Sequence, residues 1–119
     1  MKAPSAGSSR THVQEILDGV RARCDVAARR EADPVGFVHR YTELHDRELV
    51  ALVAACIAFG NVAAIHSKLD DLLSRLGPSP ARHADDPRAV RTMLRGWRHR
   101  IYVGDDIARL LAGARAVQR

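Results

Sequence analysis

An apolar run near the middle of the chain constrains the fold more than any other feature. From Leu49 to Phe59 the sequence contains only Leu, Val, Ala, Cys, Ile and Phe. A helix that is hydrophobic around its whole circumference must be surrounded by other elements. At about 1.5 Å per residue this helix is too short to cross a bilayer. We therefore predict that residues 47–59, starting at Arg47, form the buried central helix of a small domain.

The composition favours helices around this centre. The chain has 119 residues, of which 46% are hydrophobic and only 4% aromatic. Such a length suits one domain, and the core must be built from Ala, Leu, Val and Ile. Aliphatic cores of this kind favour packed helices over a β-sandwich. We predict an all-α fold of about six helices, with no strand.

The N-terminal part is expected to comprise a flexible tail over residues 1–10, followed by a single helical domain over residues 11–119. Thr11, with Gln14 in capping-box position, is predicted to begin the first helix. Apolar residues then recur at helical spacing and define one stripe: Val13, Ile16, Leu17, Val20, Cys24 and Ala27.

Capping residues mark the later helices. Short polar residues that precede helical patterns are predicted as N-caps: Asp33, Asp46, Asn61, Asp86, and either Asp105 or Asp106. Gly60 and Gly77 are expected to end helices. The last helix has an apolar stripe of its own: Ile107, Leu110, Leu111, Ala114 and Val117.

Cysteine usage and the absence of apolar leaders bear on the compartment. Cys24 and Cys56 form no C-x-x-C motif, which argues against a disulfide framework or a zinc knuckle. Both are expected to be buried thiols in a reducing cytoplasm. The sequence has no signal-peptide core and no run of about 18 apolar residues. We expect a cytoplasmic protein that makes no membrane contact.

The excess positive charge lies in the last part of the chain. Residues 1–86 hold 11 basic and 12 acidic side chains, whereas residues 87–119 hold 8 and 2. Within the basic part, Arg88, Arg91 and Arg95 follow i, i+3, i+7 spacing, with Arg98 and Arg100 just beyond. Guanidinium groups bind phosphate oxygens in pairs, so these five residues are candidate nucleic-acid contacts. The alternative is a solvated basic face in a chain where 17 of 19 basic residues are Arg.

No arrangement of residues indicates catalysis. The six His residues are scattered, and no nucleotide-binding or nucleophile motif occurs. His45, Asp46 and Glu48 are close in sequence, but Asp46 and Glu48 are explained as capping and first-turn charges. Trp97 and Tyr102 are either base-stacking residues or helix anchors. We expect no catalytic residue, no metal and no cofactor in this chain.

Four segments together resemble a bacterial family of unknown function: DPVGFVHRY at 33–41, DRELVALVAACIAFGNV at 46–62, LGPSP at 76–80 and WRHRIYVGDDIARLL at 97–111. That family is itself distantly similar to the helix-hairpin-helix superfamily of base-excision DNA glycosylases. The resemblance implies an all-α fold and contact with DNA. It also implies that this chain corresponds to the N-terminal half of longer family members.

The superfamily's catalytic segment has no counterpart here. A Pro-Leu-Asp-Thr-His segment and a Leu-Pro-Gly-x-Gly hairpin are both missing, and Gly60-Asn61 is the only comparable corner. No catalytic residue is therefore carried over, and the chain alone is not expected to be an enzyme. The expected partners are DNA, a missing C-terminal half or a second copy. The alternative function is an interaction or homo-oligomerisation module that docks through residues 107–117.

Overall fold

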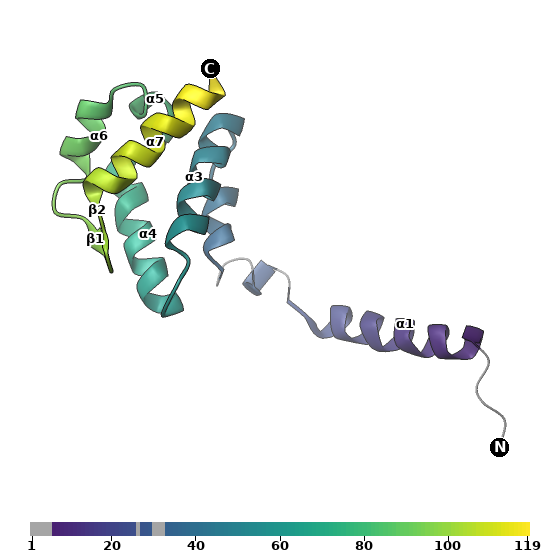
Figure 1. The fold of residues 1–119 in the computed structure, drawn as a ribbon. Helices are drawn as coiled ribbons and strands as arrows, with labels where there is room; N and C mark the ends of the chain where they lie inside the picture. The colour runs from purple at the N-terminus through teal and green to yellow at the C-terminus, as the bar shows by residue number, and fades with distance from the viewer. Residues whose placement is uncertain (1–5, 26, 30–32) are drawn as a thin grey trace.

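In the residues that the structure describes, the chain is all-α apart from one short hairpin, which confirms the predicted fold class (Figure 1). The computed structural model describes residues 6–25, 27–29 and 33–119. The helices are α1 (Ala6–Arg23), the 3-10 helix η1 (Pro34–Arg40), α3 (Leu44–Ile57), α4 (Val62–Leu76), α5 (Pro80–His83), α6 (Pro87–Met93) and α7 (Gly104–Gln118). Two strands, β1 (Arg98–His99) and β2 (Tyr102–Val103), pair antiparallel between α6 and α7.

Helix α1 lies apart from a body formed by η1 and α3 to α7 (Figure 1). It begins at Ala6, so Thr11 lies within the helix and not at its N-cap. Residues 6–10 are thus helical where a flexible tail was expected, and residues 1–5 lie outside the described part of the chain. Four aliphatic side chains of the apolar stripe on α1 are exposed to solvent: Val13, Ile16, Leu17 and Val20. An exposed apolar face of this kind is unusual in a monomeric protein.

Helix α3 occupies the centre of the body, but only one of its faces is buried. It packs against η1, α5 and α7 through Leu49, Val50, Val53 and Ile57, each no more than 2% exposed. Residues on its other side, including Ala51, Leu52, Ala55 and Cys56, are exposed. The apolar run therefore marks the centre of the fold correctly, while the expectation that this helix is covered all round is met on one face only.

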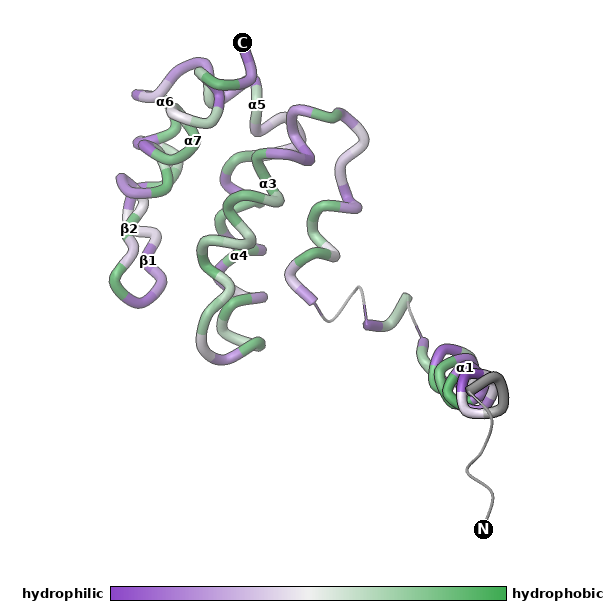
Figure 2. The backbone as a smooth tube through the Cα atoms, turned by 45° about the vertical axis from the view of Figure 1, so that its right-hand side comes forward, coloured by the Kyte–Doolittle hydropathy of each residue, from purple (hydrophilic) through white to green (hydrophobic). Residues whose placement is uncertain are grey.

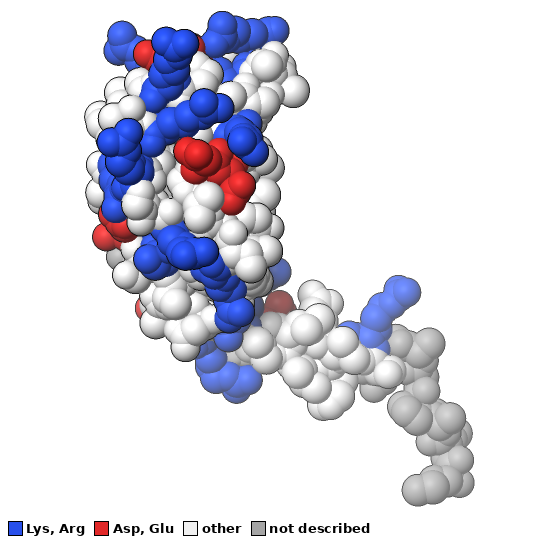
Figure 3. Space-filling view, turned by 60° about the vertical axis from the view of Figure 1, so that its left-hand side comes forward, with Lys and Arg blue, Asp and Glu red and all other residues white. Residues whose placement is uncertain are grey.

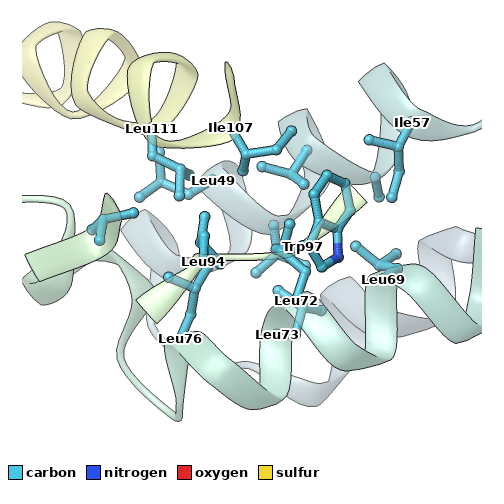
Figure 4. Packing of buried hydrophobic residues seen from close by; sticks show 14 of the residues in the cluster. Leu49, Ile57, Leu69, Leu72, Leu73, Leu76, Leu94, Trp97, Ile107 and Leu111 are labelled. Atoms are coloured by element: carbon cyan, nitrogen blue, oxygen red, sulfur yellow. The ribbon is translucent and has the colours of Figure 1, made fainter. Parts of the chain in front are cut away.

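The hydrophobic core lies between α3, α4, α6 and α7, and its largest member is Trp97 (Figure 4). Leu69, Leu72 and Leu76 enter it from α4 at helical spacing, and Leu94 enters from the end of α6. Ile107 and Leu111 of α7 are 2% and 1% exposed. The apolar stripe in residues 107–117, which was the candidate docking surface, is thus largely packed against the core of the body.

Three of the predicted N-caps act as predicted, whereas the prediction that Asp105 or Asp106 is the N-cap of α7 is wrong. Asp33, Asn61 and Asp86 each accept a hydrogen bond from a backbone amide in the first turn of η1, α4 and α6. At the start of α7 the N-cap is Val103, and Asp106 accepts a hydrogen bond from the Val103 N–H at 2.9 Å.

Asp46 was wrongly predicted as the N-cap of α3. The helix begins two residues earlier, at Leu44, and Asp46 is 5% exposed. Its Oδ1 accepts a hydrogen bond from the backbone N–H of Ala81 at 2.8 Å, in the first turn of α5. A carboxylate on α3 therefore satisfies an amide at the start of another helix and ties the two elements together.

We expect replacement of Asp46 by Ala to lower the free energy of unfolding by about 1–3 kcal/mol, because it leaves the buried Ala81 amide without an acceptor. Asp46→Asn keeps an acceptor oxygen and should lose less. Asp70→Ala, which removes an exposed ion pair with Arg40, serves as the control and should change stability by less than about 1 kcal/mol. Urea unfolding monitored through Trp97 fluorescence measures all three, and equal losses in Asp46→Ala and Asp70→Ala would contradict this role.

Candidate nucleic-acid interface

The end of α6, the hairpin and the start of α7 meet around Trp97. The Trp97 N–H donates to the Leu94 carbonyl at 3.0 Å, and the Trp97 carbonyl accepts from the Gly104 N–H at 3.0 Å. A Cβ on Gly104 would lie 2.1 Å from the Leu94 carbonyl oxygen, so only glycine allows α7 to begin this close to the end of α6. The two helix ends are thereby held together at one surface.

An open pocket of about 570 Å³ lies at this junction. Arg91, Arg95 and Arg98 line it together with Gly96, Trp97, Val103, Gly104 and Asp105, among others. We call this site the arginine pocket. It combines three guanidinium-bearing residues from α6, the following turn and β1 with the first turn of α7, whose amide dipoles favour anions. Asp105 contributes the one carboxylate that lines the pocket.

The predicted row of arginines on one helix face is not present as such. Helix α6 ends at Met93, so Arg95 lies beyond the helix, and Arg88 does not line the pocket. The turn at Gly96, with φ of +80°, instead brings Arg98 to the same site as Arg91 and Arg95. Three of the five candidate residues are thus brought together by the turn and not by helical periodicity.

Arg100 has a different position. It is the residue at the hairpin turn with φ of +54°, a conformation that non-glycine residues seldom adopt. Its guanidinium carbon lies 5.5 Å from the centre of the Phe59 ring. A Cβ on Gly60 would approach the Arg100 Nη2 to 2.3 Å. Arg100 therefore packs the hairpin against the turn between α3 and α4, outside the arginine pocket.

The arginines that line the pocket have no acidic partner in the described part of the chain. The salt bridges there involve Arg40, Arg75, Arg115 and Arg119. Arg75 also donates from Nη1 to the Arg95 carbonyl at 2.7 Å, which fixes the backbone at the pocket edge. Figure 3 shows Lys and Arg side chains gathered along this side of the body, with a smaller acidic patch among them.

The hairpin tip is a feature that the sequence prediction missed. Ile101 is 79% exposed and follows Arg100 directly, so that these two residues form the turn between β1 and β2. The turn lacks the Gly, Asn or Asp that usually identify a tight hairpin, so no local signal predicted it. Below the tip, His99 is 5% exposed, and its Nε2 has no hydrogen-bond partner among the described residues.

Trp97 is an anchor and not a base-stacking residue. It is 2% exposed, and its indole N–H donates to the Lys68 carbonyl of α4 at 2.9 Å. Of the two interpretations of Trp97, the helix anchor is therefore confirmed. Tyr102 is half-buried, with its ring centre 5.7 Å from that of Phe59 in an edge-to-face arrangement.

The group at His45, Asp46 and Glu48 joins helices. Nη1 of Arg115 lies 3.0 Å from His45 Nδ1, and Gln118 donates to the Glu48 carboxylate at 3.0 Å. Both contacts hold the end of α7 against the start of α3. Cys56 is exposed and Cys24 half-buried, which corrects the expectation of two buried thiols. Within the described residues, no cluster of His, Cys, Asp or Glu suits a metal, and no helix could span a membrane.

A comparison with protein-family models identifies the family to which this chain belongs. The family described as "Protein of unknown function (DUF2400)" matches residues 33–119. The chain belongs to this family. The DUF2400 match runs from the cap of η1 to the end of the chain, so it contains the arginine pocket and the hairpin, and α1 lies before it. Searches of curated proteins and of solved structures find no match.

We expect the stability of this DUF2400 chain to fall in acid partly through Asp85. The hydrogen bond from Arg115, at 2.9 Å, lowers the pKa of Asp85 below its usual value of 3.8. A carboxylate with a lowered folded-state pKa contributes stability above its unfolded pKa and loses it as the pH falls through the folded value. Thermal unfolding between pH 6 and pH 2 should therefore show a smaller acid loss for Asp85→Asn than for the parent. A loss of the same size in both chains would contradict this contribution.

Proposed function

We propose that this chain binds the phosphodiester backbone of DNA through the arginine pocket. The observation that carries the proposal is the convergence of Arg91, Arg95 and Arg98 on one open site without acidic partners in the described part of the chain. Guanidinium groups form paired hydrogen bonds to phosphate oxygens, and a helix N-terminus beside them adds amide donors. The Asp105 carboxylate also lines the pocket and offsets part of this positive charge.

The hairpin tip adds a reason to favour duplex DNA over other phosphate ligands. Ile101 is 79% exposed at the hairpin tip, directly after Arg100. Proteins that bind the minor groove use Arg or Lys beside an apolar residue that inserts between base steps. We assign Arg98 and Ile101 to these two roles. Arg100 supports the tip from below through its contact with Phe59.

The resemblance to base-excision DNA glycosylases fits this proposal and refines it. A protein of that kind binds duplexes that contain a damaged or missing base, where the stack is easier to open. We infer that an abasic duplex is bound more tightly than an intact one. The chain offers no assigned catalytic residue, so the proposal concerns binding alone.

We expect the triple variant Arg91→Ala, Arg95→Ala, Arg98→Ala to weaken DNA binding by a similar factor for all sequences. Each lost phosphate contact reduces the slope of log affinity against log salt by about 0.9, so the slope should fall by roughly 2 to 3. The matched control removes the same charge from exposed positions that do not line the pocket: Arg29→Ala, Arg82→Ala, Arg109→Ala. Fluorescence anisotropy with labelled single-stranded, duplex and abasic DNA at several salt concentrations measures both. Equal weakening in the two triple variants would mean that binding depends only on the net charge of the chain, and would contradict a specific site at the arginine pocket.

We expect Ile101→Ala to lower affinity for the abasic duplex several-fold while leaving single-stranded binding nearly unchanged, because only a stacked duplex offers base steps for insertion. Val117→Ala is the control, since Val117 is 87% exposed and lies near the end of α7. The same anisotropy titrations give the comparison. A loss that is identical for duplex and single strand would argue against insertion.

A further inference from the structure

Two apolar faces of this chain lack a partner. The first is on α1, where Val13, Ile16, Leu17 and Val20 are 51% to 62% exposed. Their spacing places all four on one side of the helix. Figure 2, which views α1 nearly along its axis, shows the hydrophobic residues on one side of the helix and the hydrophilic residues on the other. We call this face the α1 stripe.

The second face is a groove of about 410 Å³ between η1, α3 and α4. Its α3 side is formed by Ala51, Ala55 and Ala58, which follow i, i+4, i+7 spacing, and its flanks carry Val38 of η1 and Ile65 of α4. We call it the α3 groove. Small residues along a helix let another helix approach closely.

The two faces are complementary in shape and in charge. The α1 stripe offers branched aliphatic side chains, and the α3 groove has a floor of Ala. Helical spacing places Arg10 and Arg21 along one border of the stripe, whereas Glu15 and Asp18 lie on the far side of the helix. Asp33 is the one carboxylate-bearing residue that lines the groove. The groove that would receive the basic-edged stripe therefore carries an acidic residue and no basic one.

We propose that the occupant of the α3 groove is the α1 helix of a second copy of this chain. In the structure α1 extends away from its own body, whose groove stays open, and the molecule measures 72 Å along its longest axis. Two copies that exchange these helices cover both stripes and both grooves in one closed, two-fold arrangement. Two helices that each bury a stripe against an equal area of groove remove on the order of 1,500 Å² from water, the size of a standard specific interface.

The proposal is independent of DNA binding, because the arginine pocket is formed by α6, the hairpin and α7 and shares no lining residue with the α3 groove. The experiment therefore needs no DNA, and its outcome does not depend on that of the binding titrations. It uses the full chain with Cys24 and Cys56 replaced by Ser.

Chains that carry Leu17→Cys are mixed with chains that carry Ala55→Cys and treated with a short bifunctional thiol reagent. We expect a covalent product of two different chains, because the stripe of one copy meets the groove of the other. Ala22→Cys lies on the opposite face of α1 and is the control, which should give little product with Ala55→Cys. No product from the Leu17 pair, or equal product from both pairs, overturns the proposal. So does an internal cross-link formed in a Leu17→Cys, Ala55→Cys double variant that stays monomeric, because α1 then folds onto its own groove.

Sedimentation of uncross-linked chains provides the second measurement. We expect a dimer for the parent, a monomer for Leu17→Asp and a dimer for Ala22→Asp. The last two variants add the same charge to the same helix on opposite faces, so loss of helix propensity affects both. Circular dichroism verifies that the body stays folded in each. A parent that is monomeric at tens of micromolar, or a Leu17→Asp chain that remains dimeric, overturns the proposal.

Discussion

The burial of Trp97 fixes the geometry on which the candidate interface depends. Its backbone N–H donates a hydrogen bond to the Leu94 carbonyl at the end of α6, and its carbonyl accepts one from the N–H of Gly104, the first residue of α7. Its indole N–H donates to the Lys68 carbonyl of α4. The ring fills the centre of the core at 2% exposure. One residue thus holds two helix ends and the base of the hairpin in a single arrangement. Because the arginine pocket is built from these same elements, its shape follows from core packing and not from contacts among the arginines.

The body and α1 illustrate opposite uses of apolar residues. In the body, α3 contributes one face to the core and leaves a second face of small residues open. On α1, four aliphatic side chains remain half exposed or more. Each face would cost free energy if left in water, so both are expected to be covered in the functional state. The DUF2400 match begins at residue 33. Helix α1, which we propose to cover the groove, therefore lies outside the part of the chain that matches the family.

Local signals in the sequence predicted the elements well where a short-range rule applies. Asp33, Asn61 and Asp86 cap helices because each bonds amides two or three residues away. Asp46 resembles them in sequence, but it bonds an amide 35 residues away, which no local pattern reveals. The prediction of a row of arginines on one helix face was wrong for a related reason. Helical periodicity was extended past Met93, where the chain turns, and the turn at Gly96 then produced a cluster that periodicity alone would not predict.

The sequence by itself determined the all-α class, the central position of α3, the starts of η1, α4 and α6, and the concentration of positive charge after residue 86, because composition, capping and periodicity act over a few residues. The tertiary structure decided which arginines converge, that Trp97 is an anchor, that Ile101 projects from a hairpin, and that one face of α3 stays open. Those features depend on contacts between residues far apart in the chain. Such contacts are set by how the helices pack, and packing depends on the shapes of all the elements together.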